Sequence, residues 1–185
     1  MAMTLITNSA DTDSTDLTNI SFTSGIDSTY KLYIFKFIDI NPATDEADFA
    51  VQFNAASGSG FNETITSTFF HVFHDEADVG GQADLGYHTG HDQAQGTAYQ
   101  HIGYDMGNSA DESVAGTLWL FNPSNTTYVK HFYSQVCGDA SVESASYSKT
   151  WFASGYINTT SAIDEVDFKM ISGNFDGTIK MYGVG

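Results

Sequence analysis

The fold class of this 185-residue chain is decided by one stretch, Val166-Asp-Phe-Lys-Met-Ile-Ser-Gly-Asn-Phe-Asp-Gly-Thr-Ile-Lys-Met-Tyr-Gly-Val184. Apolar residues alternate with polar ones on both sides of a central cluster of turn formers, at Val166, Phe168, Met170, Ile179 and Met181. Period-two alternation interrupted by such a cluster, here Ser172–Gly177, predicts two β-strands joined by a short loop. A strand near a chain end is held in place when it pairs within a sheet, so the stretch predicts a closed β domain.

The same alternation recurs along most of the chain, and turn-forming clusters separate the segments. Strands are expected at Asn19–Thr23, Tyr30–Ile40, Asp48–Asn54, Thr64–His74, Thr97–Tyr104, Gly116–Asn122, Tyr128–Cys137, Ser148–Ile157, Glu165–Ile171 and Thr178–Tyr182. Nine or ten strands at this spacing predict an all-β protein, an antiparallel, jelly-roll-like β-sandwich. No segment has convincing helical periodicity, although residues 134–148 leave room for a short helical turn.

The domain organisation follows from where the pattern starts and where it is interrupted. Residues 18–185 are expected to form one β-sandwich domain, which is long enough to bury a sizeable core. Residues 1–17, rich in Thr, Ser and Asp, are expected to be a flexible or docking arm or an edge segment. The first strand, Asn19–Thr23, and the last are expected to pair. A long Gly- and His-rich loop, Asp75 to about Gln95, is inserted in the domain, and loops of this length are usually functional or mobile.

The charge of the chain restricts its partners. It has 23 acidic and 6 basic residues, for a formal net charge of −17. Nucleic acid and anionic membranes are disfavoured partners, because both attract clustered Lys and Arg. The stretch of about 18 apolar residues that a membrane helix needs is missing. The opening Met1–Thr7 lacks the basic and apolar regions of a signal peptide, so synthesis in the cytoplasm of the producing cell is expected.

The single cysteine and the two tryptophans are expected in the core. Cys137 has no partner for an internal disulfide and ends an apolar strand, which favours a small buried hydrophobe over a nucleophile. Trp119 and Trp151 lie inside predicted strands and are expected to be buried. A sugar-stacking platform is the alternative for the tryptophans.

Five of the six histidines lie between residues 71 and 101. His71 and His74 are three residues apart on a strand, so they should point to opposite faces and not share a metal. His88 and His91 lie in the long loop beside Asp92, and imidazole with carboxylate can hold Zn²⁺ or another transition metal. A polar loop with incidental histidines is the alternative.

A second metal candidate is the acidic run Asp11–Asp16, whose spacing is that of a Ca²⁺ loop without its central Gly and distal Glu. A solvated acidic tail explains this run better. The expectation is therefore a protein without a required cofactor, with Zn²⁺ or Ca²⁺ left open.

Catalytic motifs give no specific signal. No Gly-x-Ser-x-Gly elbow, phosphate loop or dinucleotide fingerprint occurs. Carboxylates are plentiful, and no pair is singled out for glycoside hydrolysis. We therefore expect no enzyme and no catalytic residues. The residues best placed to contact a partner or a glycan lie around the long loop, and they are Tyr87, His88, His91, Asp92, Tyr99 and Tyr104.

Both ends of the chain resemble structural proteins of tailed bacteriophages, particularly those of marine bacteria. The resemblance lies in Ile20-Ser-Phe-Thr-Ser-Gly-Ile-Asp-Ser-Thr-Tyr-Lys-Leu-Tyr-Ile-Phe35, in Ile38–Asp45 and in Ile171–Val184. In that group a first strand of the form I-x-F-T-S-G-I-D-x-T-Y-x-x-Y is matched by a last strand ending G-x-I-K-L-Y-G, in which Met181 replaces the usual Leu. About 40 residues are covered, and the motifs are strand and turn motifs without chemistry.

The resemblance implies a jelly-roll or lectin-like sandwich on the virion surface, as a capsid decoration or a small tail or fibre appendage. Such a protein would dock on other capsid or tail proteins, form a homo-oligomer, with a trimer favoured, and contact host-surface glycans as a further partner. A decoration protein would dock through an arm, for which Met1–Leu17 is the candidate. A receptor-binding appendage would use a cluster of loops, for which Asp75–Gly96 and Asp105–Ala115 are the candidates. The alternative function is a carbohydrate-binding module or a carbohydrate-active enzyme with a β-sandwich fold.

Overall fold

The structure, a computed structural model, describes residues 2–8, 17–77, 83–142 and 145–185. Its regular elements are all strands: β1 (Met3–Asn8), β2 (Ile20–Phe22), β3 (Leu32–Pro42), β4 (Ala47–Ala55), β5 (Ile65–Asp75), β6 (Ala83–Tyr87), β7 (Ala94–Gly96), β8 (Gln100–Met106), β9 (Val114–Phe121), β10 (Lys130–Val142), β11 (Ala145–Ile157), β12 (Ile163–Met170) and β13 (Phe175–Val184). Within these ranges there is no helix, and so none that could cross a membrane.

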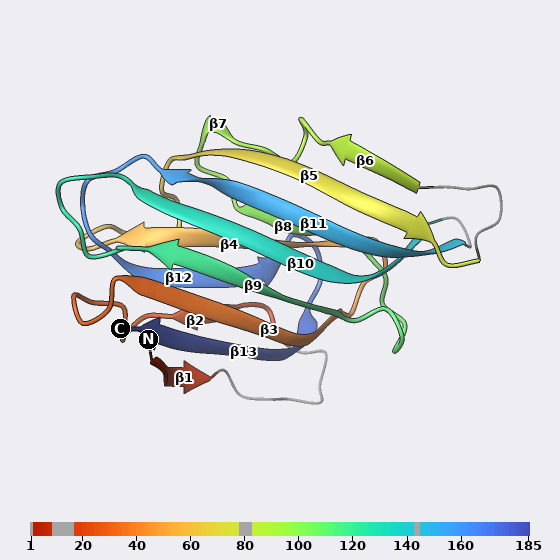
Figure 1. Cartoon of the computed structure of the whole chain (residues 1–185), viewed down its shortest axis with the longest axis horizontal. Helices are drawn as coiled ribbons and strands as arrows, with labels where there is room; N and C mark the ends of the chain where they lie inside the picture. The colour runs from red at the N-terminus through yellow and green to blue at the C-terminus, as the bar shows by residue number, and fades with distance from the viewer. Residues whose placement is uncertain (1, 9–16, 78–82, 143–144) are drawn as a thin grey trace.

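The strands form two sheets, which pack face to face as a sandwich. The large sheet has the order β1-β13-β3-β9-β10-β11-β5-β6, with β7 also paired to β5. The small sheet has the order β2-β12-β4-β8 and lies behind the large one in the view of Figure 1. Every pairing is antiparallel. The all-β antiparallel sandwich expected from the sequence is confirmed, and its jelly-roll connectivity stays a prediction.

The strand count, the long loop and the possible helical turn need correction. The described residues form thirteen strands instead of the nine or ten expected. The expected long loop contains β6 and β7, which both pair with β5 and extend the large sheet. Residues 134–148 hold no helical turn where they are described, because β10 and β11 form a long hairpin there. Alternation was too weak in these segments to separate strand from loop.

The N-terminal segment is partly an edge strand. Its residues Met3–Asn8 form β1 and pair with the last strand, β13, so the two chain ends meet (Figure 1). The expected partner of β13 was Asn19–Thr23, and that expectation is wrong, because β2 pairs with β12 in the other sheet. The acidic run Asp11–Asp16 lies outside the described residues.

The decisive stretch Val166–Val184 spans both sheets. Its first strand, β12, belongs to the small sheet and its second, β13, to the large sheet, so the turn cluster crosses from one layer to the other. Gly177 has φ 115° at a bulge between β13 and β3, where a Cβ would lie 2.5 Å from the Asp39 carbonyl oxygen. The glycine is therefore required by both its conformation and its close approach.

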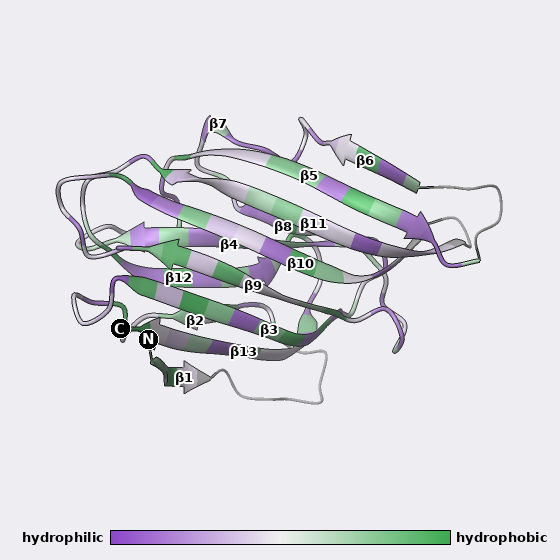
Figure 2. Cartoon of the chain, viewed as in Figure 1, coloured by the Kyte–Doolittle hydropathy of each residue, from purple (hydrophilic) through white to green (hydrophobic). Residues whose placement is uncertain are grey.

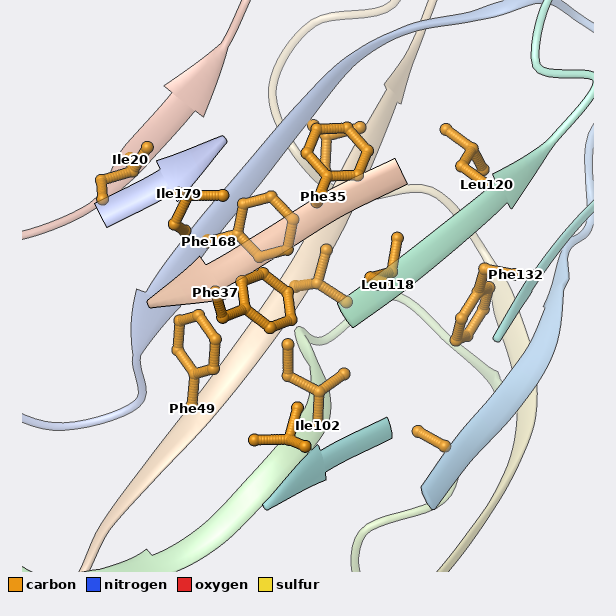
Figure 3. Packing of buried hydrophobic residues seen from close by; sticks show 14 of the residues in the cluster. Ile20, Phe35, Phe37, Phe49, Ile102, Leu118, Leu120, Phe132, Phe168 and Ile179 are labelled. Carbon is orange, nitrogen blue, oxygen red and sulfur yellow. The ribbon is translucent and has the colours of Figure 1, made fainter. Parts of the chain in front are cut away.

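Aromatic side chains fill the space between the sheets. Phe168 of β12 lies among the rings of Phe35, Phe37 and Phe49 (Figure 3). The ring of Phe22 joins this group, in which ring centroids are 5.2 to 6.2 Å apart. These rings are at most 4 % exposed. Figure 2 shows apolar and polar bands along β3 and β5, and adjacent apolar residues such as Phe69 and Phe70 put apolar side chains on both faces of the strand.

Candidate functional site

Four of the six histidines converge at one side of the sandwich, where β8 at the edge of the small sheet approaches β5 of the large sheet. The imidazole cluster consists of His71, His88, His91 and His101 around Tyr104. It arises because β5 and β8 each turn a polar ring toward the interior, and a turn after β6 supplies the other two imidazoles. His71 is 5 % exposed, whereas His74 points outward, as strand alternation predicts.

Tyr104 is the centre of the imidazole cluster. Its hydroxyl lies 2.7 Å from His71 Nδ1 and 2.9 Å from His88 Nε2. A hydroxyl has one proton, so Tyr104 donates to one imidazole and accepts an N–H from the other, which fixes the two rings as a pair. The Lys149 ammonium lies 4.2 Å from the centre of the Tyr104 ring and 3.7 Å from Asp105 Oδ2.

The other two imidazoles face a carboxylate from β4. His101 Nδ1 lies 3.3 Å and His91 Nε2 4.0 Å from Asp48 Oδ2, and the three side chains are 20 to 24 % exposed. We call these residues the Asp48 triad. One ligand atom from each lies within 4.8 Å of the others. Buried Gln100 positions the triad, because its Nε2 donates to the backbone oxygens of both His91 and His101.

The electrostatics favour neutral imidazoles beside an ionised carboxylate. Burial, followed by the charges of His88 and Lys149, lowers the pKa of His71 to about 4. Burial also lowers the pKa of His88 and of His91. Burial opposes ionisation of Asp48, but the His101 side chain and the Asp105 amide outweigh it, so the pKa of Asp48 is lowered. Neutral imidazole and ionised carboxylate are the forms that bind metal ions.

The site residues predicted from the sequence lie at three different places in the structure. His88 and Tyr104 join the imidazole cluster, and His91 belongs to it and to the Asp48 triad. Asp92 does not join them, because it accepts a hydrogen bond from the exposed Tyr87. Tyr99 donates to Asp167 of β12, 2.7 Å away, where burial and this bond raise its pKa. Tyr104 is a correction: it is only 7 % exposed, so it cannot be a surface contact.

Sequence reasoning missed part of this site. Asp48 lies more than 40 residues before His91, and nothing in its local sequence distinguishes it from the other acids. His101 and His71 were visible only as members of a histidine-rich region. Lys149 lies on β11, and its approach to Tyr104 depends on the pairing of β11 with β5. Residues that are brought together only by the pairing of distant strands leave no recognisable sequence motif.

The outer face of the large sheet is a second candidate site. Cross-strand register aligns its side chains in four rows that run from β1 or β9 toward β5 and β6. Their large apolar members are Met3, Val184, Leu32, Phe121, Tyr156, Leu5, Tyr182, Ile34, Trp119, Tyr133, Phe152, Phe70, Tyr87, Val72 and Leu85. Two stacked pairs stand out, Phe70 on Phe152 and Trp119 on Tyr133, with centroids 4.8 and 5.0 Å apart.

Two of the residues expected in the core lie on this outer face. Cys137 is exposed, which corrects the prediction of a buried cysteine, because its strand turns that position outward. Trp119 is half-buried on the outer face, whereas Trp151 is fully buried, so the prediction holds for one tryptophan only. Whether the odd- or the even-numbered residues of a strand face the core decides which of these side chains are buried. The sequence does not reveal this choice, because these strands carry apolar residues on both faces.

A pocket of about 590 Å³ opens at one end of this face. Its lining includes Phe121, Tyr128, His131, Asn122 and Asn125, and it contains no carboxylate. Tyr128 is 70 % exposed at its rim. An apolar surface with a few amides suits ligand binding and lacks the acid–base pair that glycoside hydrolysis needs.

Comparison with known proteins finds no matching family model, no matching curated protein and no matching solved structure. The function of the chain therefore has to be inferred from its own residues and geometry.

Proposed function

We propose that this chain is a non-enzymatic surface protein of a bacteriophage virion, a capsid decoration or small tail or fibre appendage, which docks through the outer face of its large sheet. The observation that carries the proposal is the composition of that face. Seven of its large apolar side chains are 36 to 69 % exposed, namely Met3, Leu5, Phe70, Val72, Leu85, Tyr87 and Phe121. Soluble monomers seldom expose so many large apolar side chains on one sheet face. The virion context is supported by the resemblance of the chain ends to phage structural proteins.

The distribution of charge supports docking at this face. The chain has 23 acidic residues, yet the four rows of the outer face contain no Asp or Glu among the described strands. Lys36 and Lys180 are the rows' two lysines. Within the four rows a partner can approach without desolvating carboxylates, whereas the next row of this face carries Asp139 of β10, aligned with Ser148 and His74.

The occupant that fits best is an apolar, mildly acidic protein surface of the particle. The two lysines favour a partner with acidic groups opposite them. The exposed edge strands β1 and β6 allow further contacts by strand addition, since Met3, Leu5 and Leu85 are 49 to 69 % exposed. The proposal includes a homo-oligomer, with a trimer favoured, because a particle carries repeated copies of its surface proteins.

Lysine footprinting tests the docking face. Lys36 and Lys180 lie on it, whereas Lys31 and Lys169 lie outside the four rows, which gives a matched control within one chain. We expect amine acylation, followed by mass spectrometry, to show about tenfold slower labelling of Lys36 and Lys180 in virus particles than in the free chain, as burial at an interface core excludes the reagent. Lys31 and Lys169 should label at equal rates in both. Equal labelling of all four lysines, or virus particles without this chain, would contradict the proposal.

Carbohydrate binding is a second candidate function, and the pocket beside Tyr128 is the observation that favours it. Exposed aromatic rings next to Asn side chains provide the stacking and hydrogen bonds that sugars need. A glycan array probed with the purified chain should then give signals that fall about tenfold in Tyr128→Ala, since a stacking contact contributes roughly 1.5 kcal/mol. The exposed Ile171→Ala variant should bind like the parent chain. Signals unaffected by Tyr128→Ala would exclude this pocket.

A further inference from the structure

We propose that the Asp48 triad binds a first-row divalent transition metal ion, with Zn²⁺ as the probe of choice. Two imidazole nitrogens and one carboxylate oxygen approach one another from three separate segments, β4, the turn after β6 and β8. This inference goes beyond the docking function, and it concerns a different part of the molecule from the outer face.

The distances between the three ligand atoms are slightly longer than those of a metal site, so the ligands would need to move only a little closer together. The ligand atoms are 3.3 and 4.0 Å from one another across the two Asp48 contacts, and all lie within 4.8 Å. Ligands that bind Zn²⁺ at about 2.0 to 2.2 Å in a tetrahedron stand roughly 3.3 to 3.6 Å apart. Rotations of side chains that are 20 to 24 % exposed can supply this change. The same exposure gives the ion an entry path.

The contact between His101 and Asp48 does not meet the hydrogen-bonding needs of the triad. His101 Nδ1 is at ion-pair distance from Asp48, but it is buried and makes no hydrogen bond of good geometry. Coordination would replace this poorly aligned contact with a directional metal–nitrogen bond. Asp48 Oδ1 is held separately by the Asp105 amide at 3.2 Å, so Oδ2 is left to face the imidazoles.

The donor set also selects among metals. Two imidazoles and one carboxylate are the ligands of three-residue zinc sites and of non-haem iron sites, which leave positions for water. Ca²⁺ and Mg²⁺ require oxygen ligands and should not compete. The surroundings hold the imidazoles ready, because Gln100 and the ring of Tyr104 constrain them.

Calorimetric titration of the chelator-stripped chain with Zn²⁺ tests the site, and Co²⁺ absorption reports the ligand geometry. We expect one ion per chain, a visible Co²⁺ spectrum and an upward shift of the melting temperature. Asp48→Asn, His91→Gln and His101→Gln each remove a ligand and should weaken Zn²⁺ binding by about 100-fold or more, since loss of an outer partner alone costs about 10- to 100-fold. Circular dichroism confirms that each variant is folded.

His74→Gln is the matched control, because it removes an imidazole on the opposite face of β5. It should bind Zn²⁺ like the parent chain. The proposal is overturned if the parent chain does not bind Zn²⁺, if His74→Gln weakens binding as much as the triad variants do, or if Ca²⁺ displaces the ion. These results do not depend on lysine footprinting, so the metal site and the docking face can fail separately.

Discussion

Phe168→Ala should lower the free energy of unfolding by about 3 to 5 kcal/mol, which is a large part of the stability of a domain. Phe168 is fully buried, and its ring contacts those of Phe35, Phe37 and Phe49 (Figure 3) and that of Phe22, so that both sheets contribute. Its removal loses the transfer free energy of the ring and leaves a cavity, because neighbouring aromatic rings can close it only partly. Equilibrium denaturation in urea measures the change.

A nearby apolar residue provides the control for this substitution. Ile171 follows β12 closely and is 45 % exposed, so Ile171→Ala should change the free energy of unfolding by less than about 0.5 kcal/mol. If Phe168→Ala costs no more than Ile171→Ala does, the aromatic group is not the packed centre of the sandwich. Such a result would also remove the physical basis for packing the inner face of β12 against the large sheet.

The fold class could be predicted because each central strand carries its own signal. Val166–Met170 alternates cleanly, and so does Phe49–Phe53, whose inward rings are fully buried. Which strands pair could not be predicted in the same way. The chain crosses between sheets after β12, and local patterning does not distinguish such a crossing from a hairpin. β6 and β7 were missed because they are short edge strands whose residues are largely exposed.

The candidate site could be predicted only as a region. The density of histidines pointed to residues 71–101, and this region does contain the imidazole cluster. Its carboxylate could not be chosen, because Asp92 lies next to His91 in sequence whereas Asp48 lies next to it in space. The outer face was missed for a related reason. Its rows exist only after the register of eight strands is known.

The imidazole cluster makes stability depend on pH in a predictable direction. An unfolded histidine has a pKa of about 6.5, whereas burial, His88 and Lys149 lower the pKa of folded His71 to about 4. Between these values the unfolded chain binds more protons than the folded one, so stability rises with pH. The contribution of His71 is therefore complete above about pH 6.5 and is lost as the pH falls toward 4.

His71→Gln isolates this contribution, because glutamine cannot titrate but can still hydrogen-bond to Tyr104. In the presence of a chelator, the parent chain should lose roughly 2 to 3 kcal/mol more than the variant between about pH 7 and about pH 4. The comparison cancels the opposing effect of carboxylate protonation, which relieves repulsion in this acidic chain. Urea denaturation of both proteins across this range gives the difference. Parallel stability curves would show that His71 titrates normally and that burial of the cluster is not maintained in solution.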